Sequence, residues 1–92
     1  MKETLMTPDM CMKFLIWSYY YYDIIPTSDF DFAECEKLSS ELVLRLNNIK
    51  DMMLRCFTED SVLRAVEQLR KAKMQNEVCP YSKIELDAIF LS

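Results

Sequence analysis

The side chains best suited to chemistry are carboxylates that gather in one short stretch, residues 23–36. The stretch holds five acidic residues and no Lys or Arg: Asp23, Asp29, Asp31, Glu34 and Glu36. Two neighbouring carboxylates can act as general acid and general base, or can hold a cation. The Asp29-x-Asp31 pair, however, lacks the glycine and the ligand pattern of a calcium loop. We therefore interpret the stretch as a solvated acidic loop and helix N-terminus, without a catalytic or a metal site.

Two residue types on which many enzymes depend are missing from the sequence. The chain has no histidine, which is the usual general base and the commonest metal ligand. It also has no glycine, which excludes Gly-rich phosphate loops and dinucleotide-binding turns. A cysteine nucleophile most often relies on histidine as its base. We therefore expect a protein that is not an enzyme, and we expect no cofactor, no metal and no small-molecule substrate.

The four cysteines lie too far apart in the sequence to form a recognisable zinc or redox motif. More than 20 residues separate each of them from the next: Cys11, Cys35, Cys56 and Cys79. The first three fall on apolar rows of predicted helices, where a free cysteine behaves as a small apolar residue. We therefore predict buried thiols in a reducing compartment, which means an intracellular protein of the cytoplasm or nucleus. The alternative is a secreted protein with two disulfides.

All of these groups must be positioned by the segment 7–25, which is apolar on nearly every side. The Thr-Pro-Asp sequence at residues 7–9 is a strong helix start, with a capping side chain, a proline at the first position and an acid at the positive end of the dipole. We predict a helix from Pro8 to Tyr22 or Asp23 that is buried nearly all round. A strand is the alternative, because the segment is rich in aromatic and β-branched residues.

A run of four tyrosines, residues 19–22, indicates that part of this helix is an interface. At about 100° per residue the four rings spread over about 300° of the helix, so one small core cannot hold them all. Tyrosine and tryptophan are also favoured anchors at binding surfaces. We predict that at least two of the four tyrosine rings face a second chain; the alternative places them in the core. The residues predicted to bind a partner are Trp17, Tyr19, Tyr20, Tyr22 and Phe90.

A second helix is predicted from apolar residues that recur at steps of three and four. It starts near Asp29 or Asp31, where Asp31 and Glu34 resemble a capping box, and it continues to about Cys56. The alternative is a break at Asn48, because asparagine favours helix ends over helix interiors.

A third helix is predicted from a cap at Thr58 to about residues 75–76. Its first turn is acidic and its last turn is basic, which matches the helix dipole. Residues 61–74 carry a local charge of +3. This basic stretch supports an alternative function, a nucleic-acid-associated regulator that uses residues 61–74 as its recognition helix. The net charge of −4 argues against nucleic acid and against anionic membranes as partners, because both attract cationic proteins.

The two ends of the chain are less regular than the middle. Residues 1–6 are predicted to be a frayed lead-in. Residues 83–91 are predicted to form a short helix with Ile84, Ala88 and Leu91 on its inner face. An extended tail is the alternative, because apolar and polar residues also alternate there with a period of two.

Together these patterns predict one all-α domain, residues 1–92. We expect a small bundle of three main helices plus a short C-terminal helix, built around the all-round apolar first helix. That helix is too short to span a membrane, which takes about 20 apolar residues, so we expect no membrane partner. The predicted function is a non-catalytic protein–protein interaction module: an adaptor, a regulatory subunit or a dimerisation domain. Its partner is expected to be another protein or a second copy of the chain.

Overall fold

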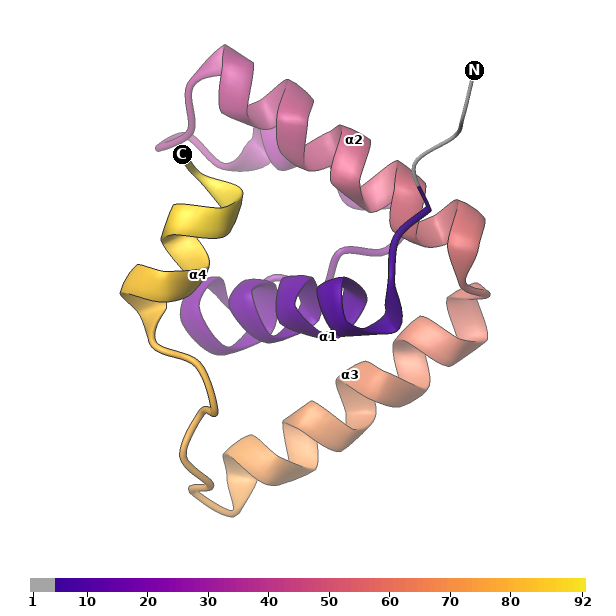
Figure 1. Ribbon diagram of the computed structural model, residues 1–92, viewed down its shortest axis with the longest axis vertical. Coiled ribbons are helices and arrows are strands. Elements are labelled where there is room, and N and C mark those ends of the chain that lie inside the picture. Colours follow the sequence, from indigo (N-terminus) through magenta and orange to yellow (C-terminus); the bar gives the residue numbers. More distant parts are fainter. Residues whose placement is uncertain (1–4) are drawn as a thin grey trace.

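The computed structural model describes residues 5–92, and within that range every regular element is a helix (Figure 1). Four α-helices follow one another along the chain: α1 (Pro8–Ile16), α2 (Ser40–Cys56), α3 (Glu59–Met74) and α4 (Lys83–Phe90). A π-helix, η1 (Trp17–Tyr21), extends α1, and a 3₁₀-helix, η2 (Phe32–Glu34), precedes α2. The prediction of an all-α bundle with three main helices and a short C-terminal one is confirmed.

Helix α1 lies in the middle of the bundle, and α2, α3 and α4 are arranged around it (Figure 1). It starts as predicted, because the Thr7 hydroxyl accepts a hydrogen bond from a first-turn N–H at 3.1 Å and a proline follows. Phe14 is fully buried, and its ring centroid lies 5.3–6.1 Å from those of Trp17, Phe32 and Phe90. These three rings come from η1, η2 and α4, so Phe14 joins the elements at the centre of the core.

The first helix ends by widening into η1 and then reversing direction at Asp23. The Ile24 N–H donates a hydrogen bond to the Ser18 carbonyl at 2.8 Å, and Asp23 takes a left-handed φ of 54°. Aspartate tolerates this conformation better than most residues. The predicted end at Tyr22 or Asp23 therefore agrees with the structure. The widened turn was not foreseen, and it changes which side chains face the core after Ile16.

The predicted start of the second helix was wrong, because α2 begins at Ser40 and not near Asp29 or Asp31. The Asp31 carboxylate caps only the short η2, where it accepts a hydrogen bond from the Ala33 N–H at 2.9 Å. The cap of α2 is Ser39, whose hydroxyl accepts a hydrogen bond from the Leu42 N–H at 3.3 Å.

Tertiary contacts explain why the chain turns before α2 instead of continuing as one helix. Phe32 is fully buried against Phe14 of α1, and its N–H donates to the side-chain oxygen of Asn47 at 3.2 Å. The Asn47 amide in turn donates to the Asp31 carboxylate at 2.8 Å. A continuous helix could not fold back onto α2 in this way. The helix α2 itself runs unbroken through Asn47 and Asn48, so the alternative of a break at Asn48 is also wrong.

Helix α3 agrees with the sequence-based prediction, whereas α4 presents a different face to the core. The Thr58 hydroxyl caps α3, which buries Val62 and Val66. The tail is helical, but its inner face is formed by Leu86 and Phe90, and Ile84 is 84% exposed. The prediction that Ile84 and Ala88 point inward is therefore wrong.

The prediction of a frayed lead-in can be compared with the structure only from Leu5 onward, because residues 1–4 lie outside the described range. Met6 is buried, and its N–H lies 3.4 Å from the sulfur of Cys56 at the end of α2. The prediction of a frayed segment is therefore wrong for Met6, which packs between α1 and α2. Leu5, in contrast, is exposed.

Candidate functional site

The five residues predicted to bind a partner separate into an inner and an outer group. Trp17 and Phe90 are only 1% exposed, and their ring centroids lie 5.4 Å apart in the core. Neither ring offers surface to another chain in this arrangement. Tyr19, Tyr20 and Tyr22 are half-buried, so part of each ring remains accessible to a partner.

Asp87 of α4 links Trp17 of the inner group to the half-buried Tyr22, although it was not singled out from the sequence. One carboxylate oxygen accepts hydrogen bonds from the Trp17 indole N–H at 2.9 Å and from the Tyr22 hydroxyl at 3.0 Å. The second oxygen pairs with the Lys83 ammonium at 2.6 Å. The Tyr22 ring lies between Trp17, at 4.6 Å, and Lys83, at 5.2 Å. The signal in the sequence was an acid inside the otherwise apolar stretch 86–91.

Two opposing effects act on the pKa of Asp87. Burial raises the pKa of the carboxyl group. The hydrogen bonds from Lys83, Trp17 and Tyr22 together lower the pKa by more than burial raises it, so the pKa lies below its usual value. The carboxylate is therefore ionised at neutral pH. Its role is to hold α4 against η1, because each of its oxygens is engaged with a donor.

Tyr21 is tied to the chain that leads into α4. Its hydroxyl donates a hydrogen bond to the Tyr81 carbonyl at 2.5 Å, and the Cys79 thiol lies beside it. The interaction with Cys79, together with burial, raises the pKa of Tyr21 to about 12. Lys13 of α1 lies over the Tyr81 ring at 5.3 Å. These contacts make Tyr21 and Tyr81 part of the framework that joins α1 to the segment before α4.

Tyr19 and Tyr20 form the outer group, at the end of the bundle where α3 finishes. Their ring centroids lie 6.3 Å apart with the planes nearly perpendicular. The Lys73 ammonium lies 4.8 Å from the centroid of the Tyr19 ring. Burial raises the pKa of Tyr20, and the nearby Cys79 and Glu77 add to this effect. Both rings therefore lie against the last turn of α3 and the segment that follows it.

Two strongly exposed apolar side chains belong to the same end of the molecule. Met74, the last residue of α3, is 79% exposed, and Val78 is 91% exposed. We call the surface formed by Tyr19, Tyr20, Met74, Val78 and Cys79 the tyrosine surface. Its residues come from η1, the end of α3 and the α3–α4 connection (Figure 1).

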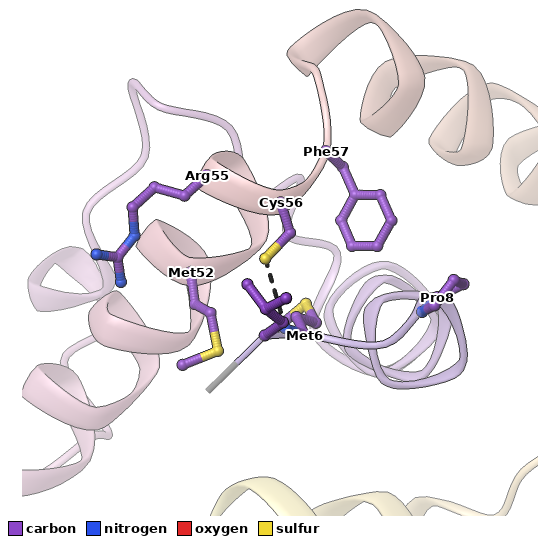
Figure 2. A pocket seen from close by; sticks show the side chains of 7 residues that line it. Met6, Pro8, Met52, Arg55, Cys56 and Phe57 are labelled. Carbon is purple, nitrogen blue, oxygen red and sulfur yellow. Dashed lines mark hydrogen bonds between the residues drawn. The ribbon is translucent and has the colours of Figure 1, made fainter. Parts of the chain in front are cut away.

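A cavity of about 440 Å³ opens where the chain enters α1, on the side of α2 (Figure 2). Met6, Met52, Cys56 and Phe57 line it, with Arg55 at its edge. Figure 2 shows the sulfur atom of Cys56 turned toward Met6, whose N–H donates to it. Leu5 and Met6, the first described residues, form part of its wall, so the start of the chain and the end of α2 enclose the cavity together.

The groups considered for chemistry in the sequence do not assemble into a centre. Among residues 5–92, no group of three or more His, Cys, Asp or Glu side chains could hold a metal ion. All four cysteines are free; Cys11 is buried, whereas the other three are half-buried. Burial, and to a lesser degree the neighbouring Cys56, raises the pKa of the Cys11 thiol. A protonated thiol is a poor nucleophile, so Cys11 acts as a packing residue.

Two of the basic side chains in residues 61–74 are engaged with the protein itself. Arg70 lies 4.0 Å from the Glu67 carboxylate, and Lys73 reaches the Tyr19 ring and the Tyr19 carbonyl. Binding of nucleic acid through this helix stays a prediction.

Comparison with known proteins assigns neither a family nor a function to this chain. No protein-family model, no curated protein and no solved structure matches this chain. In the part of the chain that the structure describes, none of the helices has the length and hydropathy needed to cross a membrane.

Proposed function

We propose that this chain is a non-catalytic protein–protein interaction module that binds its partner through the tyrosine surface. The observation that carries the proposal is that Tyr19 and Tyr20 stay half-buried at the end of α3, where Met74 and Val78 are strongly exposed, although the bundle has closed over Trp17 and Phe90. Tyrosine gives a large contact area with a polar end, and it is enriched among residues that dominate binding energy. The partner in this proposal is another protein or a second copy of the chain.

Molar mass in solution tests whether the partner is a second copy. It is measured by light scattering behind a sizing column over a hundredfold range of concentration. Self-association predicts a mass that rises with concentration and falls back to the monomer value in the Tyr19→Ala, Tyr20→Ala double variant. The matched control is the Leu44→Ala, Ile84→Ala variant, which removes two exposed apolar side chains elsewhere, 64% and 84% exposed, and should not change the mass.

If the chain is a monomer at every concentration, the partner in this proposal is a different protein, and a second experiment tests for it. A photo-crosslinking amino acid is then placed at position 20 and, as a control, at the exposed position Gln68. The proposal predicts a discrete crosslinked protein in cells that make this chain, obtained from position 20 and absent from position 68. The same pattern of crosslinks from both positions, or none from either, would contradict the proposal.

A further inference from the structure

A second cavity lies between η1 and the segment that leads to α2. Its volume is about 510 Å³, which is within the range of pockets that hold ligands or side chains of a partner. Six of its lining residues are apolar or aromatic: Trp17, Tyr22, Ile24, Phe30, Cys35 and Leu38. Glu34, Glu36 and Lys37 complete the wall. We call this feature the aromatic cavity.

The polar atoms of the two largest rings are already engaged elsewhere. The Trp17 indole N–H and the Tyr22 hydroxyl both donate to Asp87. Trp17 is 1% exposed and contributes almost no accessible surface, so the wall that a ligand can reach comes mainly from the half-buried Tyr22, Ile24, Phe30 and Leu38. A bulky apolar side chain fits such a wall better than a polar one, because a polar group would lose its hydrogen bonds to water without replacement.

The surroundings of the aromatic cavity are strongly negative. Residues 23–36 hold five carboxylates and no cation, and the stretch includes five of the lining residues. Glu34 and Glu36 are exposed, and among residues 5–92 neither makes an ion pair. Hydrogen bonds from the Ala33 N–H and from Asn47 lower the pKa of Asp31, so that this nearby carboxylate also stays ionised. Lys37 is the one cation in the wall.

We propose that the aromatic cavity binds a basic peptide segment of a partner protein. One bulky apolar side chain of the segment occupies the cavity, and its Lys or Arg side chains lie against Glu34 and Glu36. The carboxylates favour a partner segment of positive charge, and the apolar wall binds the bulky side chain that anchors the segment. This site is separate from the tyrosine surface, and it can be tested independently of it.

The chain contains a built-in reporter for this test, because Trp17 is its only tryptophan and lines the aromatic cavity. The probe is a synthetic peptide of Lys, Leu and Ala with no aromatic residue. A saturable change in Trp17 emission is expected with this peptide. No change is expected when each Lys is replaced by Glu, or when each Leu is replaced by Ser. The affinity should also fall as salt is added, because salt screens the carboxylates at the exposed rim.

Charge reversal then locates the binding site. The Glu34→Lys, Glu36→Lys variant should lose affinity for the basic peptide by about tenfold or more. The Asp51→Lys, Glu67→Lys variant changes the net charge by the same amount at exposed positions that do not line the cavity, and it should bind nearly as well as the original chain. Equal losses in the two variants, equal binding of the acidic peptide, or no emission change with any peptide would overturn the proposal.

One further variant keeps the two proposed surfaces apart. Tyr19→Ala with Tyr20→Ala removes rings that do not line the aromatic cavity, so it should leave peptide binding unchanged. Loss of self-association or of crosslinking in that variant with retained peptide binding supports both proposals. If the Tyr19→Ala, Tyr20→Ala variant retains its assembly and the Glu34→Lys, Glu36→Lys variant loses peptide binding, only the proposal for the aromatic cavity is supported.

Discussion

Ser18 is a buried polar residue without a hydrogen-bond partner for its hydroxyl among residues 5–92. It lies in η1 and is fully buried, so the hydroxyl has lost its water and gained nothing in return. We expect Ser18→Ala to raise the free energy of unfolding by about 1 kcal/mol, because the desolvation penalty of the hydroxyl disappears. Urea denaturation followed by Trp17 emission measures the change. A loss of stability in this variant would show that the hydroxyl does have a partner in solution.

Asp87 is a second single residue with a predicted effect on stability, and its removal should lower stability where removal of the Ser18 hydroxyl raises it. Asp87→Ala leaves the Trp17 N–H and the Tyr22 hydroxyl without an acceptor, and we expect it to lower the free energy of unfolding by about 2 kcal/mol. Asp87→Asn should cost less, because an amide oxygen still accepts hydrogen bonds. Equilibrium denaturation of both variants tests this order. Similar small effects in the two variants would mean that these hydrogen bonds contribute little.

The lowered pKa of Asp87 also predicts a pH dependence. A carboxyl group whose pKa is lower in the folded than in the unfolded state stabilises the fold above its unfolded pKa, near pH 4. That contribution is lost as the pH falls through the folded-state pKa. The original chain should therefore lose more stability between pH 5 and the acid range than Asp87→Asn, in which position 87 does not titrate. Thermal melts at a series of pH values compare the two chains.

At the scale of the element, α4 shows that one helix can expose the residues that its pattern places inside. Ile84 is 84% exposed, whereas Leu86 is fully buried. We expect Leu86→Ala to lower the free energy of unfolding by about 3 kcal/mol, through lost burial and the cavity left behind. Ile84→Ala, the matched control on the same helix, should change it by less than about 0.5 kcal/mol. A large loss of stability in Ile84→Ala and a small one in Leu86→Ala would show that Ile84 lies on the inner face of α4, as the sequence pattern predicted.

The start of α2 shows the same limit of a local pattern. Apolar residues keep their spacing of three and four from Cys35 to Cys56, so nothing in the spacing marks where the helix begins. The chain nevertheless turns through η2, because burial of Phe32 against Phe14 is possible only if residues 30–34 fold back. Ser39 then provides the cap that lets α2 start anew.

At the scale of the whole molecule, α1, η1, η2 and α4 meet in one aromatic cluster. The Phe14 ring contacts Trp17, Phe32 and Phe90, which come from three other elements. We expect Phe14→Ala to lower the free energy of unfolding by about 4 kcal/mol, because this side chain is fully buried and all its contacts are lost. Far-UV circular dichroism and Trp17 emission should report the loss together. Two separate transitions in the original chain would show that the elements do not share one core.

Some features of this protein were predictable because they depend on neighbouring residues alone. The caps at Thr7 and Thr58 were predicted from the sequence, and in each case the hydroxyl accepts a hydrogen bond from the N–H three residues further along the chain. The central position of the first helix also followed, because a helix that is apolar on all sides must be covered by others. The positions of the tyrosines were predictable only in part, since which rings face inward depends on the path of the chain after Ile16.

The helical class, the caps and the excess of aromatic surface in the first helix follow from residue type and short-range spacing, so they could be predicted without the structure. Only the tertiary structure decided that Trp17 and Phe90 lie inside while Tyr19 and Tyr20 stay partly outside. The physical reason is competition for one small core. Phe14 can be surrounded by only a few rings, and hydrogen bonds that the rings donate to the Asp87 carboxylate and the Tyr81 carbonyl select which of the remaining rings are drawn inward.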